Sequence, residues 1–335
     1  LRHSRSRCLG AKWSPQFNIR SRTRHLPVST TGAPLMRSVS PQQQLDLFYS
    51  MPGDIAARDA QDLMSWPFFS LAKSRRSAPI DFAMGATWIS VEAVAEHGMA
   101  TIWDADILIW AASQIVEARD AGIRPSRLMR ATPYEILRFI GRGKSLRDYQ
   151  RLKAALDRLQ STTVATSIRE TTGRRLHRFS WINEWKELAD ANGVPLGIEL
   201  ILPDWFYAGV LESALVLTID PAYFKLTGGI ERWLYRLVRK HGGKQEYGWQ
   251  FDFRHLHRKS GSTAKPYDFA CDLRALVAID RRITGHERVG YFERKLADAL
   301  GEGARGEDVI ARFDQRQTAE REQLQRVTHL ACRDR

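Results

Sequence analysis

The segment GKSLRDYQRLKAALDRLQSTTV (143–164) predicts a helix, starting at Ser145, with two chemically different faces. One face repeats apolar residues at helical spacing: Tyr149, Leu152, Leu156 and Leu159. The opposite face holds Arg147, Gln150, Ala154, Asp157 and Arg158, flanked by Arg151 and Lys153. A β-prone run follows at 161–168. Because a basic amphipathic helix followed by a strand is typical of the recognition helix and wing of a winged helix, we predict that this helix binds DNA.

The segments around this helix complete the same pattern. We expect a helix at 105–118 capped by Asp104, a strand at 127–130, and a helix at 132–141 that opens with Thr132-Pro133. Two strands are expected after the recognition helix, at 161–169 and 175–182, as the wing. Further short strands are predicted at 66–71, 86–91 and 98–103.

The second half of the chain repeats this order without repeating the sequence. It predicts a strand at 216–219, a helix at 230–241, a strand at 249–251, helices at 253–259 and 265–279, and a wing after Asp280. The 230–241 helix is expected to turn Trp233, Leu234, Leu237 and Val238 inward and Arg232, Arg236, Arg239 and Lys240 outward.

These patterns predict an α+β fold with two tandem winged-helix (helix-turn-helix) domains. A disordered basic lead-in is expected at 1–60, the first domain at 61–195, the second at 196–290, and a charged, partly helical tail at 291–335.

Charge is concentrated near the predicted recognition helix. The chain has 335 residues and a net charge of +13, which points to a polyanionic partner. Residues 124–158 carry ten basic and three acidic side chains, a net charge of +7. From Met36 onward the net charge is +6, so the 124–158 stretch accounts for that whole excess.

The first 34 residues contain no acid and are rich in Arg and Ser. Their composition fits a transit peptide or a basic arm that adds nonspecific DNA affinity. We favour a third interpretation, that 1–35 is translated upstream sequence absent from the native product, because Met36 precedes a plausible start.

Other classes of protein are disfavoured by the sequence. No apolar run approaches the roughly 20 residues that span a bilayer, so no membrane partner is expected. Three widely spaced cysteines (Cys8, Cys271 and Cys332) argue for a reducing compartment and against a zinc site or a disulfide framework. The 141–145 segment, GRGKS, lacks the first glycine and the preceding strand of a phosphate loop. Without a catalytic constellation or a metal-ligand set, we expect no enzyme activity, metal or cofactor.

Several segments resemble the replication initiator protein A family of proteobacterial plasmids, over about 66–283. They are WPFFSLAK (66–73), GMATIWDADILIWAASQIVEA (98–118), TPYEILRFIGRGKSLRDYQRLKAALDRLQSTTV (132–164), LPDWFYAGVLES (202–213), LTGGIERWLYRLVRKHGG (226–243) and FRHLHRKSGST (253–263). The resemblance implies a cytoplasmic bacterial protein that binds repeats in double-stranded DNA at a plasmid origin and helps to open the duplex. It also implies host partners, a replication initiator and the replicative helicase, and homodimers that repress their own gene.

Candidate site residues follow from the helix faces. Arg147, Gln150 and Arg151 are expected to read base edges, since Arg and Gln form bidentate bonds to guanine and adenine. Lys144, Ser145, Lys153 and Arg158 would hold phosphates, as would Arg174 and Arg175 at the wing tip. In the second domain the phosphate candidates are Lys259, Ser260, Ser262, Thr263, Lys265 and Arg274. The second recognition helix is less basic than in relatives, which leaves open whether it reads bases.

Two alternative functions use the same residues. A winged-helix transcriptional repressor would bind DNA in the same way but usually adds a sensing or oligomerisation domain. A DNA-processing enzyme would need clustered acids for Mg²⁺, which the sequence lacks. We therefore favour an origin-binding initiator.

Overall fold

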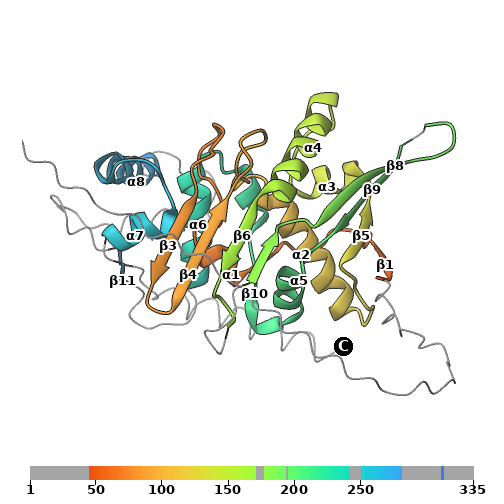
Figure 1. Cartoon of the computed structure of the whole chain (residues 1–335), viewed down its shortest axis with the longest axis horizontal. Helices are drawn as coiled ribbons and strands as arrows, with labels where there is room; N and C mark the ends of the chain where they lie inside the picture. Colours follow the sequence, from red (N-terminus) through yellow and green to blue (C-terminus); the bar gives the residue numbers. More distant parts are fainter. Residues whose placement is uncertain are drawn as a thin grey trace, which may run out of the picture. The chain divides into compact units, whose positions relative to one another are not determined.

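The computed structural model describes residues 45–170, 177–193, 195–241, 250–251, 253–280 and 311–312 (Figure 1). Helices and strands alternate along this part of the chain, which confirms the expected α+β class. The helices are α1 (Gln61–Ser65), α2 (Ala105–Asp120), α3 (Pro133–Phe139), α4 (Leu146–Ser161), α5 (Asp204–Leu211), η1 (Ser213–Leu215), η2 (Pro221–Lys225), α6 (Gly229–His241), α7 (Phe253–Ser260) and α8 (Pro266–Asp280). None of those in the described ranges is long and apolar enough to cross a membrane.

The strands form two four-stranded sheets and two short pairs. One sheet has the order β1 (Leu47–Tyr49), β5 (Leu128–Ala131), β9 (Pro195–Ile201), β8 (Glu184–Ala189). The other has the order β3 (Ile80–Met84), β4 (Thr87–Glu92), β6 (Thr163–Thr166), β7 (His177–Ser180). The pairs join β10 (Val216–Thr218) to β2 (Arg58–Ala60), and β11 (Gln250–Phe251) to β12 (Ala311–Arg312).

The hairpin that pairs with β5 is not the one expected from the sequence. β6 and β7 pair with each other, but β6 joins β4, which comes from before α2. Strand β5 pairs instead with β9, and β9 with β8. The two strands expected within 161–182 therefore form an antiparallel pair, as predicted, but this pair extends the β3–β4 hairpin and does not pair with β5. The expected second wing, after Asp280, lies in a stretch that the structure does not describe apart from β12.

Helix α2 runs through the centre of the core. Nearly all of its side chains are buried, including the polar Asp106, Ser113 and Gln114. Its N-cap residue, Asp104, makes no capping hydrogen bond through its side chain, contrary to expectation. Its carboxylate instead accepts from Thr101 N at 2.8 Å and pairs with Arg158.

Two of the expected strands are irregular segments tied to each other. Ser70 and Thr101 form an isolated parallel bridge, and Ser70 N donates to Ala100 O at 2.9 Å. The aromatic residues that suggested a strand instead fill the core: Phe68 and Phe69 pack against Trp181 with ring centroids 5.3 and 5.0 Å away. Aromatic content therefore marked burial here, not strand pairing.

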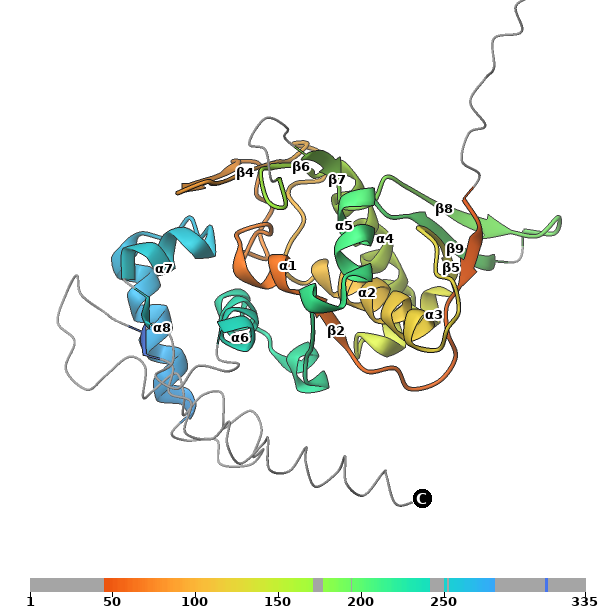
Figure 2. The ribbon, with the colours of Figure 1, turned by 90° about the horizontal axis from the view of Figure 1, so that it is seen from below.

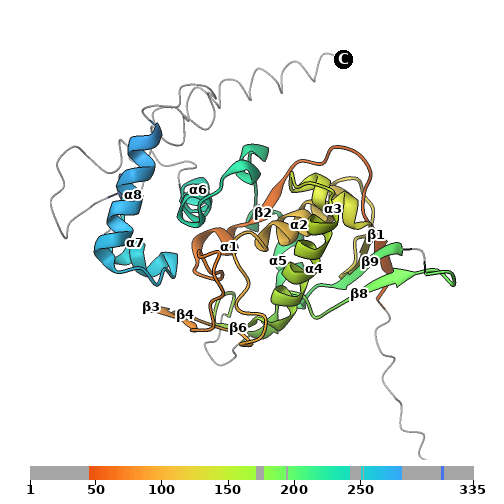
Figure 3. The ribbon, with the colours of Figure 1, turned by 90° about the horizontal axis from the view of Figure 1, so that it is seen from above.

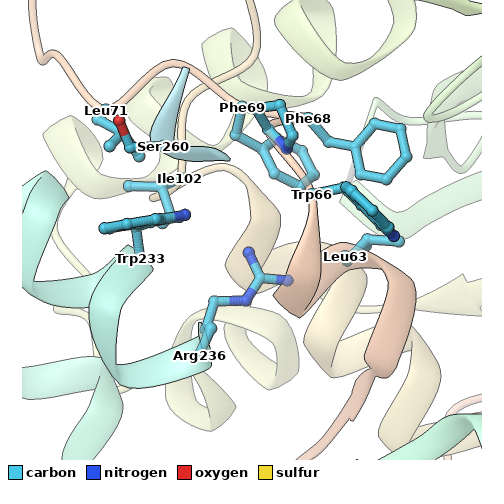
Figure 4. Close-up of a pocket in the computed structure, with 10 residues that line it drawn as sticks. Leu63, Trp66, Phe68, Phe69, Leu71, Ile102, Trp233, Arg236 and Ser260 are labelled. Atoms are coloured by element: carbon cyan, nitrogen blue, oxygen red, sulfur yellow. The ribbon is translucent and has the colours of Figure 1, made fainter. Parts of the chain in front are cut away.

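Helix α6 packs against α1 and α8 (Figure 2) and buries two arginines that we expected on its outer face. Arg232 and Arg236 are each 2% exposed. Arg236 points toward Phe69 beside a small pocket that Trp233 also lines (Figure 4). The outward assignment of these two residues is wrong because each meets a buried carboxylate from the first half of the chain.

These carboxylates belong to Asp59 in β2 and Asp106 in α2. Arg236 Nε lies 2.7 Å from Asp59 Oδ2, and Arg232 Nη1 lies 2.8 Å from Asp106 Oδ1. Asp106 also pairs with Arg142, from the turn between α3 and α4, at 3.0 Å. Burial raises the pKa of Asp106 to about 6, against the opposing effect of the two arginines, so the carboxylate remains ionised at neutral pH. Buried ion pairs thus tie α6 to the body that carries α4.

Candidate nucleic-acid interface

The start of α4 is held by a capping box. Ser145 Oγ accepts a hydrogen bond from Asp148 N at 3.3 Å, and Asp148 Oδ2 accepts one from Ser145 N at 3.1 Å. These bonds satisfy two backbone N–H groups at the helix end. The Ser145 hydroxyl also donates to Asp148 Oδ2 at 2.6 Å, and this bond, together with the one from Ser145 N, lowers the pKa of Asp148. Helix α3 has the same device, formed by Thr132 and Glu135. It ends at Phe139, and Gly141, with a φ of +66°, turns the chain away just after its C-cap Ile140. The α3–α4 turn is therefore well defined, as the sequence predicted.

We expect Ser145→Ala to lower the free energy of unfolding by about 1 kcal/mol, because the Asp148 N–H loses its partner. Denaturant unfolding measures the change. Thr132→Ala, which removes the matching cap of α3, should have a similar effect. An effect close to zero in both variants would show that water replaces the caps.

The faces of α4 agree with the expectation. Leu152, Leu156 and Leu159 are buried, with Ala155 beside them, and Tyr149 is partly buried against the core. Arg147, Gln150, Arg151 and Ala154 are exposed. Figure 3 shows α2, α3 and α4 gathered together with the β8–β9 hairpin beside them.

The three expected base readers are free to contact a ligand to different degrees. In the part of the chain that the structure describes, Arg147 and Gln150 make no hydrogen bond or ion pair through their side chains. Arg151 Nη1 lies 3.6 Å from Asp148 Oδ1, an exposed contact within one helical turn. All three can therefore turn toward a ligand on the outer face of α4.

The phosphate candidates around α4 divide into two groups. Lys144 lies over the exposed ring of Tyr134, 5.9 Å from its centroid, and Lys153 pairs with Glu187 of β8 at 2.7 Å. Both contacts are at the surface. Arg158 instead makes two bonds of 2.7 Å to the buried Asp104, and hydrogen bonding to that carboxylate raises the Arg158 pKa. The prediction that Arg158 binds phosphate is therefore wrong: its charge is used to fix α4 to the start of α2.

The wing candidates Arg174 and Arg175 lie outside the described residues. The hairpin that pairs with β5 has a different charge. Between Glu184 and Ile201 it carries four acids (Glu184, Glu187, Asp190 and Glu199) and one base, Lys186. Glu199 is buried between Lys186 and Arg130, and hydrogen bonds from them lower its pKa. We therefore do not expect the β8–β9 hairpin to attract phosphates.

Two of the phosphate candidates near α8 are buried, which contradicts their expected role. Lys259 Nζ donates to Ser65 O at 2.8 Å and lies 3.8 Å from the ring centroid of Trp66. Burial lowers the pKa of Lys259 to about 8. Ser260 Oγ donates to His257 O at 2.6 Å and accepts from Ser262 N. Lys259 therefore holds the end of α7 against α1, and Ser260 stabilises the α7–α8 turn itself.

The other candidates remain accessible. Thr263, Lys265 and Arg274 are exposed, and Ser262 is partly exposed with its Oγ accepting from Ala264 N at 3.1 Å. Sequence analysis assigned no role to Leu146 or Tyr267, each 75% exposed in the first turn of α4 and α8. The sequence does carry a signal for both residues. Each is an apolar residue at the start of a helix, outside the helical repeat of buried apolar residues. No group of three or more potential metal ligands occurs among the described residues.

Comparisons with known proteins match the chain to a family profile, to a relative and to a solved fold. The family profile described as Replication initiator protein A matches residues 58–283. The chain is 33% identical over 218 residues to the "Putative replication protein" of Wigglesworthia glossinidia brevipalpis, an alignment that covers 64% of this chain and 78% of that protein. A crystal structure of domains 2 and 3 of RctB covers 68% of this chain and 86% of its own, with a TM-score of 0.50 and 14% identity. That last likeness concerns the fold alone.

Proposed function

Since the chain belongs to the replication initiator protein A family, a family of plasmid replication initiators, we propose that it binds repeated sites in double-stranded DNA at its plasmid origin through α4. The observation that carries this proposal is the outer face of α4. It presents Arg147, Gln150 and Arg151 to solvent from a helix whose start is fixed by a capping box. Such a face fits the major groove, where Arg and Gln side chains read base edges.

Topology supports a winged helix around α4. Helix α2, strand β5, helix α3 and helix α4 follow in order, and β5 pairs with the later hairpin β8–β9. A winged helix has this order, with the hairpin as wing. The first domain therefore extends to about Leu202, since the boundary expected at 195/196 would cut the pair β8–β9. Its acidic wing would lie away from the phosphates.

The same order recurs in α6, β11, α7 and α8, and β11 pairs antiparallel with the distant β12. This recurrence supports a second winged helix in tandem with the first. The buried ion pairs of Arg232 and Arg236 would hold the two domains in one orientation on DNA.

Contacts are assigned as follows. Arg147, Gln150 and Arg151 read bases, while Lys144, Ser145 and Lys153 hold phosphates beside the first domain. Ser262, Thr263, Lys265 and Arg274 hold phosphates beside the second. Bound at successive repeats in the bacterial cytoplasm, the protein helps to open the duplex and brings in the host initiator and the replicative helicase. As a homodimer it represses its own gene.

The experiment places the gene and its flanking DNA on a circle whose only other element is a selectable marker. We expect the circle to replicate when the full chain is produced and to be lost when a stop codon interrupts the gene. Footprinting should locate the purified chain on tandem direct repeats in the flank. Binding confined to a lone inverted repeat in the promoter, with no replication, would instead assign the protein to the repressor class.

A further inference from the structure

Leu146 and Tyr267 occupy matching positions in the two helix–strand–helix–helix units. Leu146 is the first residue of α4, and Tyr267 is the second residue of α8. Each is 75% exposed, the highest value for a large apolar side chain in the described part of the chain. Holding such a side chain in water forgoes the stabilisation that burial of a large apolar side chain supplies. That two units with unrelated sequences do so at the same place indicates a shared use.

Charge around Leu146 indicates what covers it. Lys144 and Arg147 flank it, and neither makes an ion pair in the part of the chain that the structure describes. A partner that covers Leu146 must also accept these two cations. DNA meets both needs, because phosphates border the major groove and thymine presents a 5-methyl group at its floor.

The position within the helix fits this occupant. Residues in the first turn of a recognition helix lie closest to the base edges. The capping box of Ser145 and Asp148 fixes the direction in which Leu146 leaves the helix. Thr263 and Lys265 are exposed just before α8 begins, and Cys271 is exposed one turn after Tyr267. The outer face of α8 therefore begins with Tyr267, an uncharged and partly apolar side chain, and it also exposes the acidic Asp268 and Asp272.

We infer that Leu146 and Tyr267 are specificity-determining residues that each contact the 5-methyl group of a thymine in the repeat. This inference rests on the proposed function and extends it. The second domain reads sequence through an apolar contact, whereas the first combines such a contact with Arg and Gln. A low density of basic residues on α8 is then compatible with base readout.

The test removes one methyl group at a time. Duplexes carrying the repeat are made with deoxyuridine in place of each thymine in turn, and the affinity of the full chain is measured by fluorescence anisotropy at one salt concentration. We expect the wild-type chain to bind about 3- to 5-fold more weakly when a contacted methyl is missing, the effect of one buried methyl group. Leu146→Ala should lose this sensitivity at one thymine and Tyr267→Ala at another. Ile123→Ala, at an exposed position in the loop between α2 and β5 and on neither α4 nor α8, should keep both sensitivities.

Three outcomes would overturn the inference. The wild-type chain could show no sensitivity at any thymine, or both variants could keep it. The variants could also change the oligomeric state while keeping the thymine sensitivity, which would assign the two residues to a protein contact. Failure of the unsubstituted chain to prefer the repeat over unrelated DNA is a different result, because it would remove the proposed function itself.

Discussion

Arg236→Met is expected to lower the free energy of unfolding by about 3–5 kcal/mol, because it leaves the Asp59 carboxylate buried without its counter-charge. Arg236 makes two bonds to Asp59, of 2.7 and 3.0 Å, and the two side chains are 2% and 1% exposed. Water cannot replace the guanidinium at that depth. Urea denaturation followed by circular dichroism measures the loss, and Asp59→Ala should give a loss of similar size.

Two controls distinguish this explanation from simple loss of contacts. The double variant Asp59→Leu/Arg236→Met removes both charges and should recover most of the stability, since apolar pairs often replace buried ion pairs without loss. Arg138→Met breaks an exposed pair with Asp54 and should cost less than about 1 kcal/mol. If the double variant were as unstable as Arg236→Met, packing and not charge would explain the effect.

Arg147→Ala/Arg151→Ala is expected to weaken binding to the origin repeat by about 30- to 25,000-fold, because each lost base contact costs about 1–3 kcal/mol and two are lost. Binding to unrelated DNA should fall much less, since base contacts supply specificity and phosphate contacts supply general affinity. Titrations of repeat and unrelated duplexes over a range of salt concentrations separate the two effects.

A matched control removes the same charge elsewhere. Arg75, on the loop before β3, and Arg124, on the loop between α2 and β5, are both exposed and lie on neither α4 nor α8. Arg75→Ala/Arg124→Ala should therefore leave the preference for the repeat unchanged. Lys144→Ala should weaken binding to both duplexes and reduce the salt dependence by about one ion. An equal loss on both duplexes for Arg147→Ala/Arg151→Ala would reassign these arginines to phosphates.

Local structure was largely predictable from the sequence. The apolar stripe of α4, its start at Ser145 and the cap at Thr132 all followed from nearby residues, because helix periodicity and capping depend on neighbours three or four positions apart. The α+β class and the order of the main helices followed for the same reason. The expectation for Arg147, Gln150 and Arg151, that their side chains face outward, rested on the same periodicity.

Pairing between distant segments was not predictable in this way. β5 selects β9 and not β6 because β4, from another part of the chain, occupies the edge of β6. An alternating strand pattern states which face is buried, but it does not identify the partner strand. The pairing of β5 with the β8–β9 hairpin was consequently not predicted.

The sequence by itself determined the helices, their caps and the basic face of α4, because each depends on residues within a few turns of one another. Only the tertiary structure decided which charges remain available for a ligand. Arg158, Arg232, Arg236 and Lys259 look like surface cations in the sequence, yet each is held by an oxygen atom from a distant segment. A charged side chain can be buried only where such an oxygen atom contacts it. In this protein that contact depends on how distant segments of the chain pack together.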